Sequence, residues 1–173
     1  MQDAGATEII FIHGFELKKD VVQFFSATCH KHFLQKETGF ANVLRELLIN
    51  IQLEREDQVL FGMPDTVFRG NPFHQMLSIK GITCGLFITN YESKVDRLYG
   101  NKQKFAVKQS KSSSLQDWFW GVLKFEGANI IDMEAESYFS KYNEIGDILN
   151  QYDFSCINAG DYLDLGTWDN YNY

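Results

Sequence analysis

Two carboxylates stand where α/β proteins place ligands for metals and substrates. Asp65 follows the apolar residues 59–63 and Pro64, and Asp164 follows the strand-like residues 152–163. Buried strands of α/β sheets open at their C-terminal ends into a crevice where side chains meet a ligand. Two hard oxygen ligands suit Mg²⁺, which binds through one or two carboxylates together with substrate phosphates. The pair predicts a Mg²⁺ site; the alternative is that each aspartate only forms a turn or caps a helix.

Other familiar chemistries lack their motifs in this sequence. His13 and Gly14 resemble the segment that shapes the oxyanion hole of α/β-hydrolases, but the sequence has no G-x-S-x-G nucleophile turn. Neither the dinucleotide motif G-x-G-x-x-G nor the P-loop motif G-x-x-x-x-G-K-[ST] occurs. Cys29, His30 and His32 are close together, but no second ligand pair has the spacing of a zinc site.

Length and composition predict one globular domain over residues 1–173. Apolar residues make up 45% of the chain and charged residues 23%, which is typical of folded soluble proteins. No apolar run reaches the roughly 20 residues that span a bilayer, and no signal-peptide pattern opens the chain. The three cysteines are widely spaced, which argues against a disulfide framework. We therefore expect a cytoplasmic protein without a membrane partner.

The charge distribution bears on the partner. A net charge of −7 argues against nucleic acid, because phosphate backbones are bound by Lys and Arg. Residues 94–111 are nevertheless basic, with Lys94, Arg97, Lys102, Lys104, Lys108 and Lys111 against the single acid Asp96. This stretch is either a solvated basic loop or a contact surface for an anionic small molecule.

The hydrophobic pattern of the first half predicts alternating strands and helices. Strands are expected at residues 9–13, 33–36, 58–63 and 82–89. Helices are expected within 17–33, from 39 to 51, and after Pro72, which fits the first turn of a helix. The order β-α-β-α-β-α-β predicts a mixed, mostly parallel sheet of Rossmann-like α/β type with helices on both faces.

The second half of the chain does not continue the alternation of strands and helices. Residues 104–108 and 118–125 favour strands on either side of a polar loop, and residues 131–149 favour one or two helices. Residues 152–164 are strand-like but broken by Gly160, and a last helix is expected from Thr167.

Six segments taken together resemble the sugar-phosphate nucleotidyltransferases, the enzymes that make nucleoside-diphosphate sugars. They are GATEIIFIHGF, QKETGFANVLRELL, VLFGMPDTVF, WGVLKF, EIGDIL and YLDLGTWDNY, and they keep the family's order over nearly the whole chain. DLGT after an apolar pair is the most specific of them. The resemblance implies a three-layer nucleotidyltransferase (GT-A-like) fold that binds a nucleotide or nucleotide sugar.

The resemblance also implies roles for individual residues. Asp65 and Asp164 match the two acids that bind the catalytic Mg²⁺, although this chain has Pro-Asp where the family usually has Gly-Asp. The other matched positions each have a structural alternative. Gln35 and Gly39 match residues that approach the nucleotide base in the family. Trp120 and Gly121 fall where the family's Asn-Thr-Gly segment lines the sugar pocket. Lys108 matches a lysine that binds the sugar phosphate, but it lacks the usual Glu-Lys-Pro context.

One landmark of that family is not found in this sequence. Its members begin with a strand and a Gly-rich loop whose N–H groups hold the nucleotide phosphates, whereas GATEII corresponds to the end of the family's second helix. We therefore expect a domain without the first β-α-β portion and with impaired or no catalysis, because losing one positioned stabiliser commonly costs ~10²–10³ in rate. Missing strands expose sheet edges, so we also expect a homo-oligomer. The alternative function is a non-catalytic nucleotide-sugar-binding or protein-assembly module.

Overall fold

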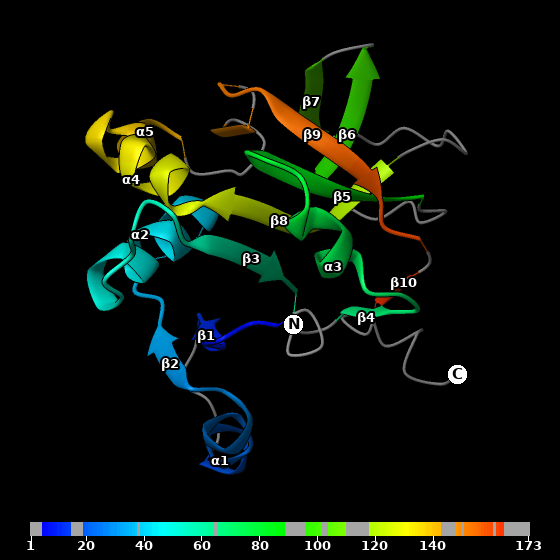
Figure 1. The fold of residues 1–173 in the computed structure, drawn as a ribbon. Helices are drawn as coiled ribbons and strands as arrows, with labels where there is room; N and C mark the ends of the chain where they lie inside the picture. The colour runs from blue at the N-terminus through cyan, green and yellow to red at the C-terminus, as the bar shows by residue number, and fades with distance from the viewer. Residues whose placement is uncertain are drawn as a thin grey trace.

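The computed structural model describes most of the chain at the level of individual elements. The described residues are 5–14, 19–37, 39–63, 66–88, 96–101, 104–109, 118–142, 148–149, 151–160 and 162–164. The chain begins with β1 (Ile10–His13), α1 (Lys19–Thr28), β2 (Lys31–Leu34), α2 (Phe40–Asn50), β3 (Gln58–Gly62), β4 (Thr66–Phe68) and α3 (Pro72–Leu77). It continues with β5 (Ile82–Ile88), β6 (Asp96–Asn101), β7 (Lys104–Gln109), β8 (Trp118–Glu126), α4 (Gly127–Ala135), α5 (Tyr138–Lys141), β9 (Phe154–Asn158) and β10 (Tyr162–Asp164), as Figure 1 shows.

A six-stranded sheet is built around β8. One edge of β8 pairs with β5, and the other edge pairs with β6 near Trp118 and with β3 from Val122 to Glu126. All three neighbours run antiparallel to β8, while β9 pairs in parallel with β5. Residues 118–126 (WFWGVLKFE) are nearly continuous in apolar side chains, as expected of a strand that is buried on both faces.

The strand directions agree with the predicted class and add one feature to it. The mixed α/β fold is confirmed, and the sheet is mixed because β8 lies between β3 and β5 and runs antiparallel to both. The strands β3, β5 and β9 do share one direction, as the β-α-β pattern predicted. The hydrophobic pattern carries no information about which later strand inserts between two earlier ones.

Two core clusters cover the two faces of this sheet. Successive residues of a strand point to opposite faces, and β8 directs Leu123 and Phe125 to one cluster and Val122 to the other. The larger cluster includes the apolar faces of α2 and α4, and the smaller one is closed by Phe73 and Met76 of α3. The predicted arrangement of helices on both faces is therefore confirmed.

Two small sheets complete the described structure. The strands β1 and β2 pair in parallel, and Figure 1 shows them below α2 and β3, apart from the six-stranded sheet. The strands β4 and β10 pair antiparallel beside α3.

Several element boundaries differ from the predicted ones. The second strand is Lys31–Leu34 instead of residues 33–36. Residues 152–164 form two strands, one on each side of Gly160, where the sequence predicted a break. The strands β4 and β6 were not predicted, because one is only three residues long and the other, DRLYGN, is largely polar. Pro72 begins α3 as predicted, and the Asn71 side chain accepts the His74 N–H at 3.2 Å. The helix expected from Thr167 lies outside the described residues.

Two observations complete the comparison with the composition. Cys29, Cys84 and Cys156 are not joined to one another by disulfide bonds. In the described part of the chain, none of the helices has the length and apolarity that crossing a bilayer requires.

The loop before β3 is held tightly against the start of α4. Gly127 N donates to Asp57 O at 2.7 Å, and Arg55 forms a bidentate ion pair with Asp132 at 2.9 and 3.1 Å. A Cβ atom on Gly127 would overlap the main-chain carbonyl of Glu54. The absence of a side chain at Gly127 is therefore what allows this close approach.

We predict that Gly127→Ala lowers the free energy of unfolding by about 1–3 kcal/mol, because main-chain atoms must shift to admit the methyl group. Urea denaturation monitored by circular dichroism measures the change. Gly70→Ala is the matched control, since a Cβ at Gly70 meets nothing within 4 Å. Equal stability of the two variants would contradict the prediction.

Two thiols face each other across β5 and β9. Cys84 and Cys156 are register partners, and burial raises the pKa of Cys156 to about 12 and that of Cys84 well above its ordinary value. In the unfolded chain both thiols ionise near pH ~8.5. The folded protein therefore holds these protons longer than the unfolded chain does.

We predict that stability is highest below pH ~8.5 and declines as the pH rises towards 12, because the unfolded state loses these protons first. Cys156→Ala should make the decline between pH 8 and 10 shallower in chemical denaturation. Ser155→Ala, which changes the exposed neighbour of Cys156 and removes no ionisable group, should keep the wild-type slope. A Cys156→Ala slope equal to the wild-type slope would show that this thiol does not contribute.

Candidate functional site

The two predicted carboxylate positions follow strands that end at the same edge of the sheet. After Gly62 and Asn158 the chain leaves β3 and β9, and the next strands, β4 and β10, pair with each other. In that pairing Asp164 is the register partner of Thr66. Asp65 lies outside the described residues, but it is bonded to Thr66 in the sequence. The antiparallel register therefore brings the segment after β3 and the segment after β9 together at Asp164.

The predicted metal ligands are Asp65 and Asp164. Among the residues that the structure describes, no group of three or more His, Cys, Asp or Glu side chains could hold a metal ion. Two carboxylates fit Mg²⁺, because this ion keeps several waters and needs few protein ligands.

Gln35 and Gly39 form a single hydrogen-bonded turn. The Gln35 Nε2 atom donates to the Gly39 carbonyl oxygen at 2.8 Å, and the Gln35 main-chain N–H donates to His13 O at 2.7 Å. The turn is thereby fastened to the C-terminal end of β1 and immediately precedes α2. The structure thus brings together two residues that the sequence matched as a pair.

Gly39 has a conformation that few other residues adopt. Gly39 is the N-cap residue of α2, with a φ of 102° and a ψ of 152°. Because glycine has no side chain, it makes no capping hydrogen bond to the helix. Residues with a Cβ are strained in this region of φ and ψ by about 1–3 kcal/mol. The choice of glycine here therefore has a structural reason in addition to the proposed one.

Gly121 stands at an irregularity in the centre of the sheet. Gly85 of β5 pairs with Val122 and Leu86 pairs with Trp120, so that Gly121 is the extra residue of a β-bulge. The pairing of β3 with β8 ends at the neighbouring position, Gly62 with Val122. Bulges are over-represented next to active sites, where they redirect the strand. Trp120 and Gly121 therefore lie in the sheet beside the end of β3 that leads to Asp65.

Lys108 is in the outer hairpin of the sheet. It is the register partner of Arg97 on β6, and Arg97 is in turn the partner of Phe119 on β8. Like charges directly opposite each other in a sheet are destabilising. Arg97 was counted in the basic stretch but was not singled out, and only the cross-strand register connects it with Lys108 and the Trp120 region.

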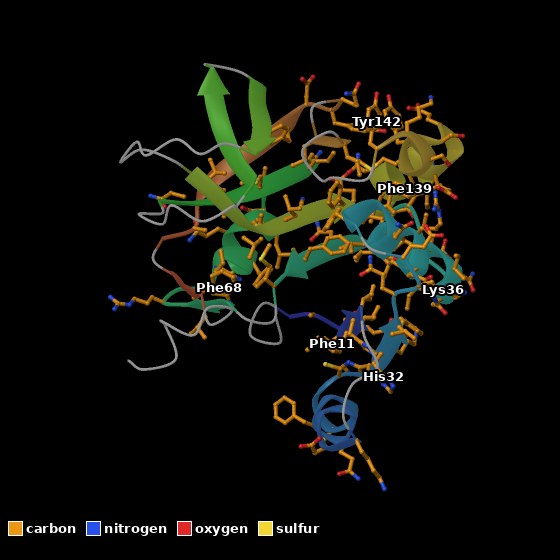
Figure 2. The ribbon with its side chains drawn as sticks, turned by 180° about the vertical axis from the view of Figure 1, so that it is seen from behind. Phe11, His32, Lys36, Phe68, Phe139 and Tyr142 are labelled. Atoms are coloured by element: carbon orange, nitrogen blue, oxygen red, sulfur yellow. The ribbon has the colours of Figure 1, made fainter. Side chains whose placement is uncertain are left out.

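The predicted residues form separate groups. Figure 2 shows Lys36, the residue after Gln35, far from Phe68 of β4. Trp120 and Gly121 are on β8, and Lys108 is two strands away from β8 on β7. A ligand that contacted all of these groups would have to extend across the edge of the sheet.

The displaced pKa values belong to other parts of the described structure. Burial lowers the pKa of Lys124. Its Nζ donates to the carbonyl oxygen of Ile79, which follows α3 in the chain. The hydrogen bond from Arg55 lowers the pKa of Asp132. The first of these groups lies at the core, and the second holds the loop before β3.

Comparison with known proteins supports the fold. No family model matches the sequence, and no curated protein matches it in sequence. A protein assigned as a glucose-1-phosphate thymidylyltransferase from Bacillus anthracis, solved with sucrose, is similar with a TM-score of 0.77 and 17% identity, over 99% of this chain and 76% of that one. HddC from Yersinia pseudotuberculosis is similar with a TM-score of 0.62 alone and 0.63 in complex with GMP-PN, at 12% identity over 99% of this chain and 78% of that one.

These likenesses establish the fold class that the sequence predicted. The chain has a mixed α/β fold similar to that of the Bacillus anthracis protein, and the similarity extends over nearly all of its residues. At these identities the comparison concerns the fold and leaves each residue role as a prediction.

We predict that Gly39→Ala destabilises the protein by about 1–3 kcal/mol, because alanine is strained at the φ and ψ of this position. Thermal or urea unfolding measures the loss. Gly14→Ala is the control, since Gly14 has a negative φ or an extended conformation and a Cβ there meets nothing within 4 Å. A Gly39→Ala variant as stable as Gly14→Ala would show that the turn before α2 relaxes without cost.

Proposed function

We propose that this chain is a nucleotidyltransferase-like domain that binds a nucleotide or nucleotide sugar together with Mg²⁺. Asp65 and Asp164 hold the ion, and the observation that carries the proposal is the register of Asp164 with Thr66 in the β4–β10 pair. Two segments that are distant in the sequence meet there only through tertiary structure. Mg²⁺ bound at this point neutralises charge on phosphate oxygens and orients them.

The remaining predicted residues are assigned to the organic parts of the ligand. The Gln35–Gly39 turn, held by its internal hydrogen bond, faces the base, and Trp120 and Gly121 at the bulge contact the sugar. Lys108 binds the sugar phosphate, and Arg97 opposite it contributes a second positive charge.

We further propose that the chain by itself has little or no transferase activity. In-line attack of a sugar phosphate on an NTP develops negative charge around the triphosphate, and positioned N–H groups and cations must stabilise that charge. The sequence contains no Gly-rich turn beside a Thr-Arg pair that resembles the family's phosphate-binding loop. If another segment supplies that loop, the reaction is sugar phosphate plus NTP giving NDP-sugar plus pyrophosphate.

The names and ligands of the structural neighbours support this proposal. The Bacillus anthracis protein is assigned as a glucose-1-phosphate thymidylyltransferase, and HddC was solved with the guanine nucleotide analogue GMP-PN. Because the identities are 17% and 12%, they provide the class of ligand to test and not its base or sugar.

We predict that NTPs or NDP-sugars stabilise the wild-type protein in a Mg²⁺-dependent manner. A ligand at 100 times its Kd raises the free energy of unfolding by about 2.7 kcal/mol, which is readily measured as a shift in Tm. Asp65→Asn and Asp164→Asn should each remove the Mg²⁺-dependent part of the shift while leaving the fold intact.

Asp153→Asn is the matched control for these variants. It makes the same change in charge, but Asp153 is exposed and precedes β9, at the opposite end of that strand from β10. Its Mg²⁺-dependent shift should equal that of the wild type. A shift that survives in Asp164→Asn would refute the metal assignment, and the absence of a shift with every nucleotide would favour the assembly module instead.

A further inference from the structure

Lys124 is a fully buried lysine in β8. Its side chain lies on the same face of the sheet as Val122, because alternate residues of a strand point to the same side. The amine donates to the carbonyl oxygen of Ile79, two residues after the end of α3. Among the described residues, this amine forms no ion pair and no second hydrogen bond. It is therefore a buried cation to which the proposed function gives no role.

Keeping a charged amine in the core is costly. Burial lowers the pKa of Lys124, and the nearby charge of Glu126 offsets only part of this effect. Its register partner Thr83 on β5 has a buried hydroxyl group without a hydrogen-bond partner, so the lysine does not satisfy that group either. Replacing buried ions with apolar residues of similar volume is often neutral or stabilising. Stability alone therefore does not explain a lysine at this position.

The hydrogen bond from Lys124 is one of two that hold the turn between α3 and β5. Glu126, two residues further along β8, accepts the main-chain N–H of Gly81 through Oε1 at 2.7 Å. Gly81 has a positive φ of 76°, a conformation that glycine adopts more readily than other residues. Lys80, between the two anchored residues, is exposed. Two side chains of β8 thus fasten the C-terminal end of α3 to the sheet.

The helix α3 supports the segment that carries Asp65. Met63 and Phe68, which lie on either side of Asp65 in the sequence, both pack against the smaller core cluster. The ring of Phe68 meets the ring of Phe73 of α3 edge to face, with the ring centroids 5.9 Å apart. A shift of α3 therefore moves the residues that flank Asp65.

The same helix supports the segment that leads to Asp164. Ala159, which follows β9, is buried in the smaller cluster with Phe73 and Met76, and Ile157 packs against that cluster. From there the chain runs into β10, which ends at Asp164. Figure 1 shows α3 between the six-stranded sheet and the β4–β10 pair. The position of α3 therefore affects both predicted metal ligands.

We propose that Lys124 is a positioning residue for the Mg²⁺ site and that it acts through α3. Its hydrogen bond to Ile79 holds α3 in the place at which Asp65 and Asp164 share one ion. The inference rests on the proposed function, and it adds a residue that belongs to neither metal-binding segment. Removing an outer group that orients metal-binding residues commonly weakens metal affinity by about 10–100-fold.

The Lys124→Met variant tests this role, because methionine fills the same space without a charge or a hydrogen-bond donor. We expect its urea midpoint to be at least as high as that of the wild type, while its affinity for Mn²⁺ falls about tenfold. Mn²⁺ alone is the probe, since carboxylates bind it as they bind Mg²⁺ and its EPR signal reports the free ion. A lysine with a merely structural role would not lose metal affinity while keeping stability.

Lys80→Met is the matched control. It removes the same charge from the same turn, but the side chain of Lys80 is exposed whereas that of Lys124 is buried. Its Mn²⁺ affinity should equal that of the wild type. Only the Mn²⁺ binding that Asp65→Asn abolishes is counted. Equal losses in the two lysine variants would show that the charge of the turn matters instead of the anchor, and would overturn the proposal.

Hydrogen exchange tests the same link without any ligand. In Lys124→Met, the amides that pair β4 with β10 should exchange at least fivefold faster than in the wild type, because α3 no longer holds these strands in place. The amides that pair β1 with β2, which belong to a separate sheet, should exchange as before. Unchanged exchange in β4 and β10 would separate α3 from the metal-binding segments and would overturn the proposal.

Two further outcomes would overturn the proposal. Wild-type Mn²⁺ affinity in Lys124→Met would show that the site does not depend on the anchor. A Lys124→Met variant that fails to fold, or that unfolds at a clearly lower urea concentration, would show that the lysine only supports the core. The proposed function fails in a different way, because the wild type would then bind no Mn²⁺ that Asp65→Asn removes. That result would overturn the metal site together with this inference, whereas the others overturn this inference alone.

Discussion

The pairing of β8 along both of its edges is the constraint on which the rest of the structure depends. Without β8, the strands β3 and β5 have no common partner, and the two core clusters have no sheet between them. The bulge at Gly121, the end of β3 and the start of α4 are all positioned by the register of this one strand. The loop before β3 then follows, because its carbonyl groups bind the N–H groups at the start of α4.

Local sequence signals predicted the elements whose pattern is strong. Burial and helix geometry impose a regular spacing on apolar residues, and this spacing was sufficient to predict several elements. These are the strands β1, β3, β5 and β8, the helix α2, and the start of α3 at Pro72. The strands β4 and β6 leave no such trace, because β4 is short and β6 is polar, and each is stabilised by a partner far away in the sequence. The position of β8 between two earlier strands is a non-local choice that no window of residues records.

The candidate site shows the same division. Gln35 and Gly39 are four residues apart, and their hydrogen bond joins positions that the sequence could already pair. Asp65 and Asp164 are about a hundred residues apart, and the sequence shows only that each follows a strand-like apolar segment. The pairing of β4 with β10 is what the tertiary structure adds. Arg97 was overlooked because its relation to Lys108 exists only across the β6–β7 pairing.

The place of β8 in the chain also has a consequence for folding during synthesis. The strand β3 pairs with β8 along its whole length, yet the ribosome completes β5, β6 and β7 before β8 is made. Until then, the apolar faces of β3 and β5 emerge without the strand that joins them, and such surfaces are prone to aggregate. Long-range pairing of this kind also slows folding, because a long loop must close before any contact compensates its entropy. The nascent chain therefore passes through a stage in which only chaperones, or rapid synthesis of β8, protect its apolar strands from aggregation.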